Sequence, residues 1–180
     1  MKLKKIKELV KINNENINKN YKEKTIAYLD TSNITKGKIE NIVEFNIENA
    51  PSRAKRIVRK NDIIYSTVRP NLCHYGLLRS IPSNLIVSTG FVVLRCDENQ
   101  ILPEYLYAYL TLPKVTQKMH SIAETSTSTY PSIKPSDLEE LIIPIPDINE
   151  QQKIANILSY IDKKIELNNQ INDNLLELII

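Results

Sequence analysis

Runs of β-branched and aromatic residues predict strands in the first half of the chain. These runs fall at residues 25–31, 39–45, 62–68 and 85–95. Gly37 and Gly76 stand between such runs, where turns are expected. Ahead of them, residues 3–10 carry apolar side chains at helical spacing, which predicts a short helix.

A helical period replaces the strand period after residue 102. Leu106, Tyr109 and Leu110 fall on one face of a predicted helix, and Pro113 is expected to open a second helix. Ser136 is expected to N-cap a short third helix. Residues 141–146 then predict an edge strand, because the two prolines in this run cannot donate ladder hydrogen bonds. The order of elements indicates an α+β fold, with a globular domain built on a mixed, curved β-sheet and short helices.

Residues 149–180 contain no Gly or Pro. A capping pair, either Asp147 with Glu150 or Asn149 with Gln152, precedes apolar residues at steps of three and four. About 31 residues make a helix of roughly 46 Å, so we expect it to protrude and to form an antiparallel coiled coil in a dimer. Asn168 interrupts the apolar row and either fixes the register of the pair or is exposed. The expected interface residues are Ile154, Ile157, Leu158, Ile161, Ile165, Asn168, Ile171, Leu175 and Leu178.

Composition narrows the class of protein. The 180 residues are 42% hydrophobic and 25% charged, as in an ordinary globular protein. No apolar run reaches the roughly 18 residues of a membrane-spanning helix, and the basic N-terminus lacks the apolar part of a signal peptide. Two cysteines are too few for a disulfide framework. We therefore expect a reduced, cytoplasmic protein.

Positive charge is concentrated in residues 51–80. This segment holds seven basic residues and the single acid Asp62, a net charge of +6, whereas the whole chain carries +3. Such a concentration fits a local contact with a polyanion, and a solvated loop is the alternative.

Signatures of catalytic chemistry are missing from the sequence. Its three glycines, Gly37, Gly76 and Gly90, are too scattered for a cofactor-binding or phosphate-binding loop. The two histidines and two cysteines lack the close spacing that anchors a zinc site. We therefore expect no catalytic residues, no cofactor and no metal ion.

Three stretches together resemble the specificity subunit of Type I restriction–modification systems. They are residues 51–70 (PSRAKRIVRKNDIIYSTVRP), residues 87–94 (VSTGFVVL), and residues 133–138 (IKPSDL) running into residues 142–158 (IIPIPDINEQQKIANIL). The proline-containing strand followed by Glu-Gln-Gln and a long helix is the most specific of these features. The resemblance covers essentially the whole chain.

The resemblance implies a target-recognition domain at residues 1–148 and a dimerisation helix at residues 149–180. Family members carry two such units in tandem and hold methylation subunits, through which motor and nuclease subunits join. Only one unit is present here, which suggests a half-length subunit that reads a palindromic split site on double-stranded DNA as a homodimer. Asn61 also departs from the family, which often has glycine before Asp-Ile.

The residues expected to contact DNA fall in three groups. Basic residues at positions 53–60 are expected to hold phosphates, whereas Arg69, Asn71 and His74 have side chains suited to base edges. Arg69 could instead pair with an acid to brace its turn. The hydroxyl-rich residues 126–130 could contact phosphates or sugars, or be only solvated. The full predicted set is Arg53, Lys55, Arg56, Arg59, Lys60, Arg69, Asn71, His74, Ser128, Thr129, Tyr130 and Lys134.

Two other functions fit parts of the sequence. A coiled-coil adaptor would use the C-terminal helix and leave the basic segment incidental. A general single-stranded nucleic-acid binder would need aromatic residues among the basic ones. Residues 53–60 contain no aromatic residue, so the second alternative ranks last.

Overall fold

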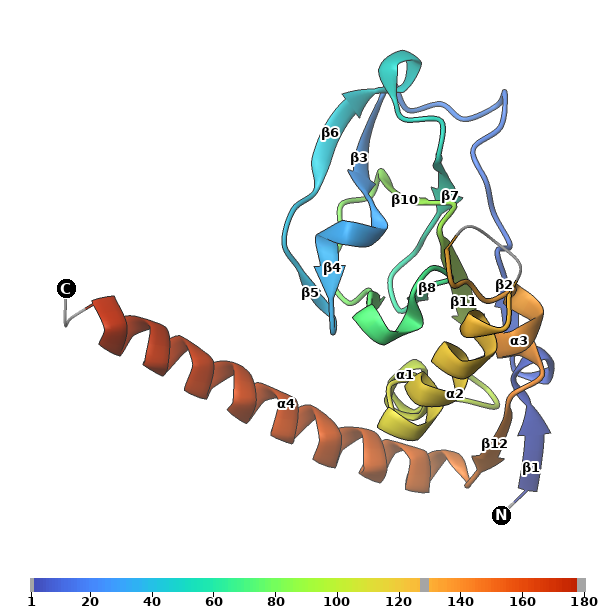
Figure 1. The fold of residues 1–180 in the computed structure, drawn as a ribbon, viewed down its shortest axis with the longest axis vertical. Coiled ribbons are helices and arrows are strands. Elements are labelled where there is room, and N and C mark those ends of the chain that lie inside the picture. The colour runs from blue at the N-terminus through green and yellow to red at the C-terminus, as the bar shows by residue number, and fades with distance from the viewer. Residues whose placement is uncertain (1, 127–129, 178–180) are drawn as a thin grey trace.

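A computed structural model describes residues 2–126 and 130–177 (Figure 1). Within the last helix, the side chains of residues 162, 163, 166, 169, 173 and 175–177 are not among those described. No helix in these ranges is both long and apolar enough to cross a membrane.

Two four-stranded sheets form the centre of the described chain. The first has the order β6-β3-β10-β7, and only its β3–β10 pair is parallel. Its strands are β3 (Thr25–Leu29), β6 (Val43–Asn46), β7 (Ala54–Ile57) and β10 (Leu85–Ser88). The second sheet is antiparallel, with the order β2-β11-β8-β9. Its strands are β2 (Val10–Ile12), β8 (Ile63–Ser66), β9 (Tyr75–Leu77) and β11 (Phe91–Cys96).

Short elements complete the described domain. Two small antiparallel sheets pair β1 (Lys2–Lys5) with β12 (Ile142–Ile145) and β4 (Ile34–Thr35) with β5 (Lys38–Ile39). The α-helices are α1 (Pro103–Leu110), α2 (Pro113–Glu124), α3 (Pro135–Glu139) and α4 (Ile148–Glu177). Short 3₁₀ turns are η1 (Ile6–Glu8), η2 (Thr31–Asn33), η3 (Ile47–Asn49) and η4 (Pro70–Leu72). The far end of α4 lies away from the domain (Figure 1).

Alternation along the strands places apolar side chains in separate cores. Leu29, Val87 and Ile64 lie in the core between the two large sheets. The other face of the second sheet packs against α1 and α2, where Leu106 and Met119 are fully buried. The fold is therefore α+β as predicted, but its strands are divided among separate sheets rather than forming one curved sheet.

The predicted helix at residues 3–10 is wrong. This segment forms β1, η1 and β2 instead. Ile6 and Leu9 are fully buried, and a 3₁₀ turn brings residues three apart to one side just as an α-helix does. The extended start of the segment is stabilised by pairing with β12, about 140 positions later, which no local pattern can reveal.

The predicted strand at residues 85–95 is two strands in different sheets. β10 pairs with β3 and β7, whereas β11 pairs with β2 and β8, and the chain crosses between the sheets at Gly90. A Cβ atom on Gly90 would lie 2.9 Å from Thr31 Cγ2 and 3.0 Å from Arg53 Nη2. Glycine is required here because the backbone passes so close to these side chains. The run at residues 39–45 is likewise divided between β5 and β6.

Two predicted helix starts have different outcomes. Ser136 does not cap α3, because the helix already begins at Pro135, and the Lys134 N–H donates to Asp137 Oδ2 at 2.7 Å. At α4 the cap is Asp147, whose Oδ1 accepts from the Glu150 N–H at 2.9 Å. This is one of the two capping pairs that the sequence left open.

Candidate nucleic-acid interface

The turn at Arg69 and Pro70 has a strained backbone on the surface. Arg69 has φ 47° and ψ 66°, in the left-handed region, where a residue other than glycine costs free energy. Hydrogen bonds hold it there: the Arg69 N–H donates to the Pro131 carbonyl at 2.9 Å, and its own carbonyl accepts from the Leu72 N–H. The side chain remains exposed. Strain maintained at an exposed arginine is typical of a binding residue.

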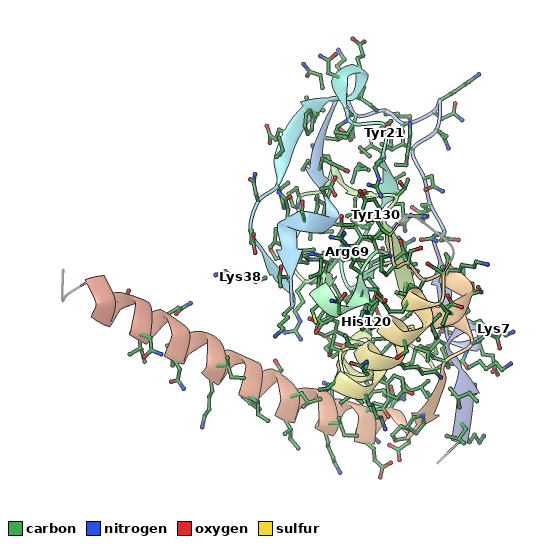
Figure 2. All side chains as sticks on the ribbon, in the orientation of Figure 1. Lys7, Tyr21, Lys38, Arg69, His120 and Tyr130 are labelled. Carbon is green, nitrogen blue, oxygen red and sulfur yellow. The ribbon has the colours of Figure 1, made fainter. Side chains whose placement is uncertain are left out.

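Residues 130–133 lie against this turn. Val68 and Ser132 form a β-bridge, and the Ile133 N–H donates to the Thr67 carbonyl at 2.9 Å. The Arg69 guanidinium lies over the Tyr130 ring, 5.0 Å from its centroid (Figure 2). No carboxylate among the described residues forms an ion pair with Arg69. Two segments that the sequence named separately therefore form one exposed surface, which we call the Arg69–Tyr130 surface.

Arg53 lies close to the segment that joins β8 to the Arg69–Tyr130 surface. Its guanidinium lies beside Gly90, whose carbonyl accepts from the Thr67 N–H at 2.9 Å and from its hydroxyl at 3.0 Å. Asp30 carries the compensating charge. Burial alone would raise the pKa of Asp30, but hydrogen bonds from Tyr28 and Thr31 and the charge of Arg53 bring it below its usual value.

The rest of the basic segment is spread over different surroundings. Lys55 is exposed on β7. Arg56 on β7 is the cross-strand partner of Val87 on β10 and is half-buried, and its Nε has no hydrogen-bond partner among the described residues. Burial lowers the pKa of the Arg56 guanidinium. Lys60 lines a cavity beside α4. Strand alternation, which sequence reasoning did not apply to residues 54–57, places the side chains of Lys55 and Arg56 on opposite faces of β7.

An ion-pair network centred on the buried Asp62 fixes the turn before β8. Asp62 is 1% exposed and accepts from the Arg59 N–H at 2.8 Å and from Arg95 Nε and Nη2 at 2.9 and 2.8 Å. Glu15 pairs with both Arg95 and Arg59, at 2.6 and 2.9 Å. The hydrogen bonds that Arg95 donates to Asp62 raise the pKa of Arg95 above its usual value despite burial. For Glu15, burial raises the pKa, but hydrogen bonds from the two arginines outweigh it and the net shift is downward.

This network changes what is expected of Arg59 as a phosphate-binding residue. Its charge is partly neutralised by Glu15, although its side chain is 65% exposed. Sequence reasoning missed Asp62, Arg95 and Glu15, and the one available signal was a lone acid before an apolar strand. Asn61 precedes it with φ 71°, so it adopts the left-handed conformation expected of the glycine it replaces, which asparagine tolerates.

Three other predicted residues have distinct surroundings. His74 Nδ1 lies 2.6 Å from the Ile34 carbonyl, and because a carbonyl can only accept, this nitrogen is the donor. His74 thereby ties the turn after η4 to β4, a bracing role. Asn71 is exposed on η4, and Lys134 is exposed before α3. Ser128 and Thr129 lie outside the described residues.

Residues 1–177 match the family of Type I restriction modification DNA specificity domains. The chain belongs to this family. The resemblance found in the sequence is thus confirmed, with its assignment to restriction–modification, specificity and target recognition.

Named relatives agree with this assignment. The specificity subunit of the Type I restriction enzyme HindI from Haemophilus influenzae is 35% identical over 150 residues, which cover 83% of this chain and 33% of that subunit. The MjaIX specificity subunit from Methanocaldococcus jannaschii is 31% identical, with 66% and 26% covered. This chain therefore spans about a third or less of the length of these relatives.

Solved structures share the fold. The HsdS subunit from Thermoanaerobacter tengcongensis superposes with a TM-score of 0.80 at 26% identity, covering 94% of this chain and 44% of that one. A chain from a structure on complex assembly and conformational transition of the type I R-M system gives 0.76 at 26% identity, covering 93% and 43%.

The α4 helix of this specificity domain exposes many apolar side chains. Ile157, Ile161 and Ile165 are 61%, 49% and 54% exposed. The remaining predicted interface residues with described side chains are also exposed, namely Ile154, Leu158, Asn168 and Ile171. The Leu175 side chain and Leu178 lie outside the description. Tyr160 and Leu167, which the sequence prediction omitted, are 69% and 55% exposed and lie seven residues apart.

Proposed function

We propose that this chain is the base-reading component of a Type I restriction–modification complex and contributes no catalytic group itself. The observation that carries the proposal is the Arg69–Tyr130 surface, where an exposed arginine is held in a strained conformation by a second segment. An arginine guanidinium can donate two parallel hydrogen bonds to guanine, and Asn71 next to it can pair with adenine. Arg53, Lys55 and Lys134 supply phosphate contacts.

The test is to express the chain with the methylation subunit of its host and to map methylated adenines. Co-purification together with methylation at one defined sequence supports the proposal. Substitution of Arg69 should then change the methylated sequence. Co-purification with no DNA binding would instead favour the coiled-coil adaptor.

We further propose that α4 pairs antiparallel with α4 of a second copy, so that the homodimer reads a palindromic split site and docks methylation subunits. Support comes from the exposed apolar side chains, which are too numerous for a helix that stays in water. Ile157, Ile161 and Ile165 form one row. Tyr160 and Leu167 extend the apolar surface, which suits contact with more than one partner helix.

Replacing both Ile161 and Ile165 by Asp is expected to abolish association. Two carboxylates buried in an apolar seam should cost about 3 kcal/mol or more, roughly a 100-fold increase in Kd. Light scattering at micromolar concentration should give the dimer mass for the wild type and the monomer mass for the variant. Lys164→Asp is the matched control, because it adds a carboxylate at another exposed position of the same turns. A monomeric wild type, or a variant of unchanged mass, contradicts this proposal.

The isolated chain is expected neither to methylate nor to cleave DNA. No three His, Cys, Asp or Glu side chains of residues 2–126 and 130–177 gather into a group that could hold a metal ion. Purified protein is incubated with DNA, labelled S-adenosylmethionine, magnesium and ATP. Turnover that follows the protein through successive purification steps would overturn the non-catalytic assignment.

A further inference from the structure

Gln151, in the first turn of α4, is fully buried and makes three side-chain hydrogen bonds to two other segments. Its Oε1 accepts from the Leu102 N–H at 2.9 Å, and its Nε2 donates to the carbonyls of Gln100 and Pro146, both at 3.1 Å. Leu102 is the N-cap of α1. One amide side chain therefore joins the start of α4, the start of α1 and the chain that leaves β12.

The rest of the attachment of α4 is small. Ala155 is 4% exposed, and Tyr105 of α1 donates its hydroxyl to the Pro144 carbonyl at 2.8 Å, just before the helix. Beyond Ala155, every described side chain of α4 is exposed except that of Ser159, which is partly exposed. The domain thus holds α4 by its first two turns.

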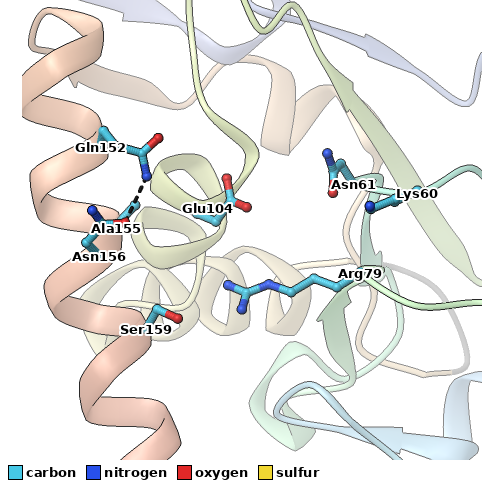
Figure 3. Close-up of a pocket in the computed structure, with 8 residues that line it drawn as sticks. All are labelled: Lys60, Asn61, Arg79, Glu104, Gln152, Ala155, Asn156 and Ser159. Atoms are coloured by element: carbon cyan, nitrogen blue, oxygen red, sulfur yellow. Dashed lines mark hydrogen bonds between the residues drawn. The ribbon is translucent and has the colours of Figure 1, made fainter.

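An open cavity lies between α4 and the domain, beside this attachment and continuing past it. It has a volume of about 470 Å³, with Arg79 and Lys60 on the domain side and Asn156 and Ser159 on the helix side (Figure 3). In the close-up, the Arg79 side chain extends toward the helix across this space. The cavity keeps this side of α4 from packing closely on the domain, so the described contacts that can orient the helix are few, and those of Gln151 are its only described side-chain hydrogen bonds to the domain.

The length of α4 magnifies any change at its anchored end. Its 30 residues span about 45 Å, so a tilt of about 10° at Gln151 moves the far end by about 8 Å. Each base pair lengthens a DNA duplex by only about 3.4 Å along its axis. A tilt of this size would therefore shift the separation between two DNA-reading units by more than two base pairs.

We infer that Gln151 is a positioning residue that fixes the angle between the recognition domain and α4, and thereby the spacer length between the two half-sites. This inference rests on the proposed function, in which two units joined through α4 read a split site. Directional hydrogen bonds at three points restrict rotation as well as distance. An apolar side chain of the same size fills the space but leaves one N–H and two carbonyls unpaired.

The test compares Gln151→Met with Gln152→Met in the full chain. Gln152 is exposed and bonds only to Asn156 on its own helix among the described contacts, so this control removes the same amide without touching the anchor. Binding is measured to one half-site and to two half-sites whose spacer changes by single base pairs. Gln151→Met should leave half-site affinity unchanged while its preference for the best spacer over its neighbours falls about tenfold, because the second contact loses effective concentration. The control should keep the wild-type preference.

A second measurement reports the angle directly and needs no DNA. Spin labels replace the exposed residues Lys38 and Gln170 as non-natural amino acids, and excess unlabelled protein ensures one labelled copy per assembly. A single narrow distance peak in the wild type and in Gln152→Met, with a broad or displaced peak in a Gln151 variant, supports the inference. Gln151→Glu, which keeps the acceptor and loses both donors, is used if Gln151→Met does not fold.

The outcomes distinguish the role of Gln151 from the proposal that two units read a split site. An unchanged peak and spacer preference in the Gln151 variants overturns the role of Gln151. A wild type with no spacer preference refutes two-unit reading, and the labelled distance then still decides whether Gln151 fixes the helix angle.

Discussion

Replacing Asp62 by Ala is expected to lower the free energy of unfolding by about 3–5 kcal/mol, because it leaves the partly buried Arg95 guanidinium with Glu15 as its remaining described ion-pair partner. Asp62 is 1% exposed and accepts three hydrogen bonds, two of them from the Arg95 guanidinium. The Arg95 side chain is 21% exposed, so water can compensate only part of the loss. Domains are stable by about 5–15 kcal/mol, so the variant should be close to unfolding. Urea denaturation of both proteins measures the difference.

Glu15→Ala is the matched control for Asp62. Glu15 also pairs with Arg95, but its side chain is 27% exposed and the pairing with Arg59 reaches solvent. Water should therefore replace much of the stabilisation that this carboxylate provides, and the free energy of unfolding is expected to fall by about 1 kcal/mol. An Asp62→Ala variant that loses no more stability than Glu15→Ala would show that the network does not hold the domain together.

Replacing Arg69 by Ala is expected to cost about 1–3 kcal/mol for each half-site and to relax base choice at one position. Two-fold symmetry requires the relaxation at two mirrored positions, so the total loss for the dimer could be about twice as large. Arg69→Lys separates charge from geometry, because lysine keeps the charge but lacks the planar fork. It should retain affinity for unrelated DNA and lose the base preference. Binding to a library of single-base variants at two salt concentrations measures all of these effects.

Two variants serve as controls for Arg69, one at Arg59 and one at Tyr130. Arg59→Ala should weaken all sequences about equally and reduce the salt slope by less than one unit, because Glu15 already neutralises part of its charge. Tyr130→Leu keeps an apolar surface beneath Arg69 and removes the cation–π contact, which is worth about 0.5–1 kcal/mol at an exposed site. A uniform loss for Arg69→Ala would reassign it to the DNA backbone. No loss would leave it only a role in the turn before Pro70.

Local patterns were sufficient where local forces decide the structure. Prolines at the first turn set the starts of α1 and α2, and Asp147 caps α4 in one of the two ways anticipated. The motif-level resemblance identified the family, because it depends on the order of residues alone. Local reasoning failed at residues 3–10 and at Gly90, where pairing with a distant strand and a crossing between sheets determine the conformation.

The sequence by itself thus determined the fold class, the family and the types of side chain available for reading DNA. Tertiary structure alone decided which of these side chains lie together. It placed Tyr130 beneath Arg69, although 60 positions separate them, and joined Arg59 to Glu15. It also buried Gln151, which reads in the sequence as one more polar residue at the start of a helix. The reason is physical: hydrogen bonds and ion pairs act over a few ångströms, and only the packed fold brings distant residues within that range.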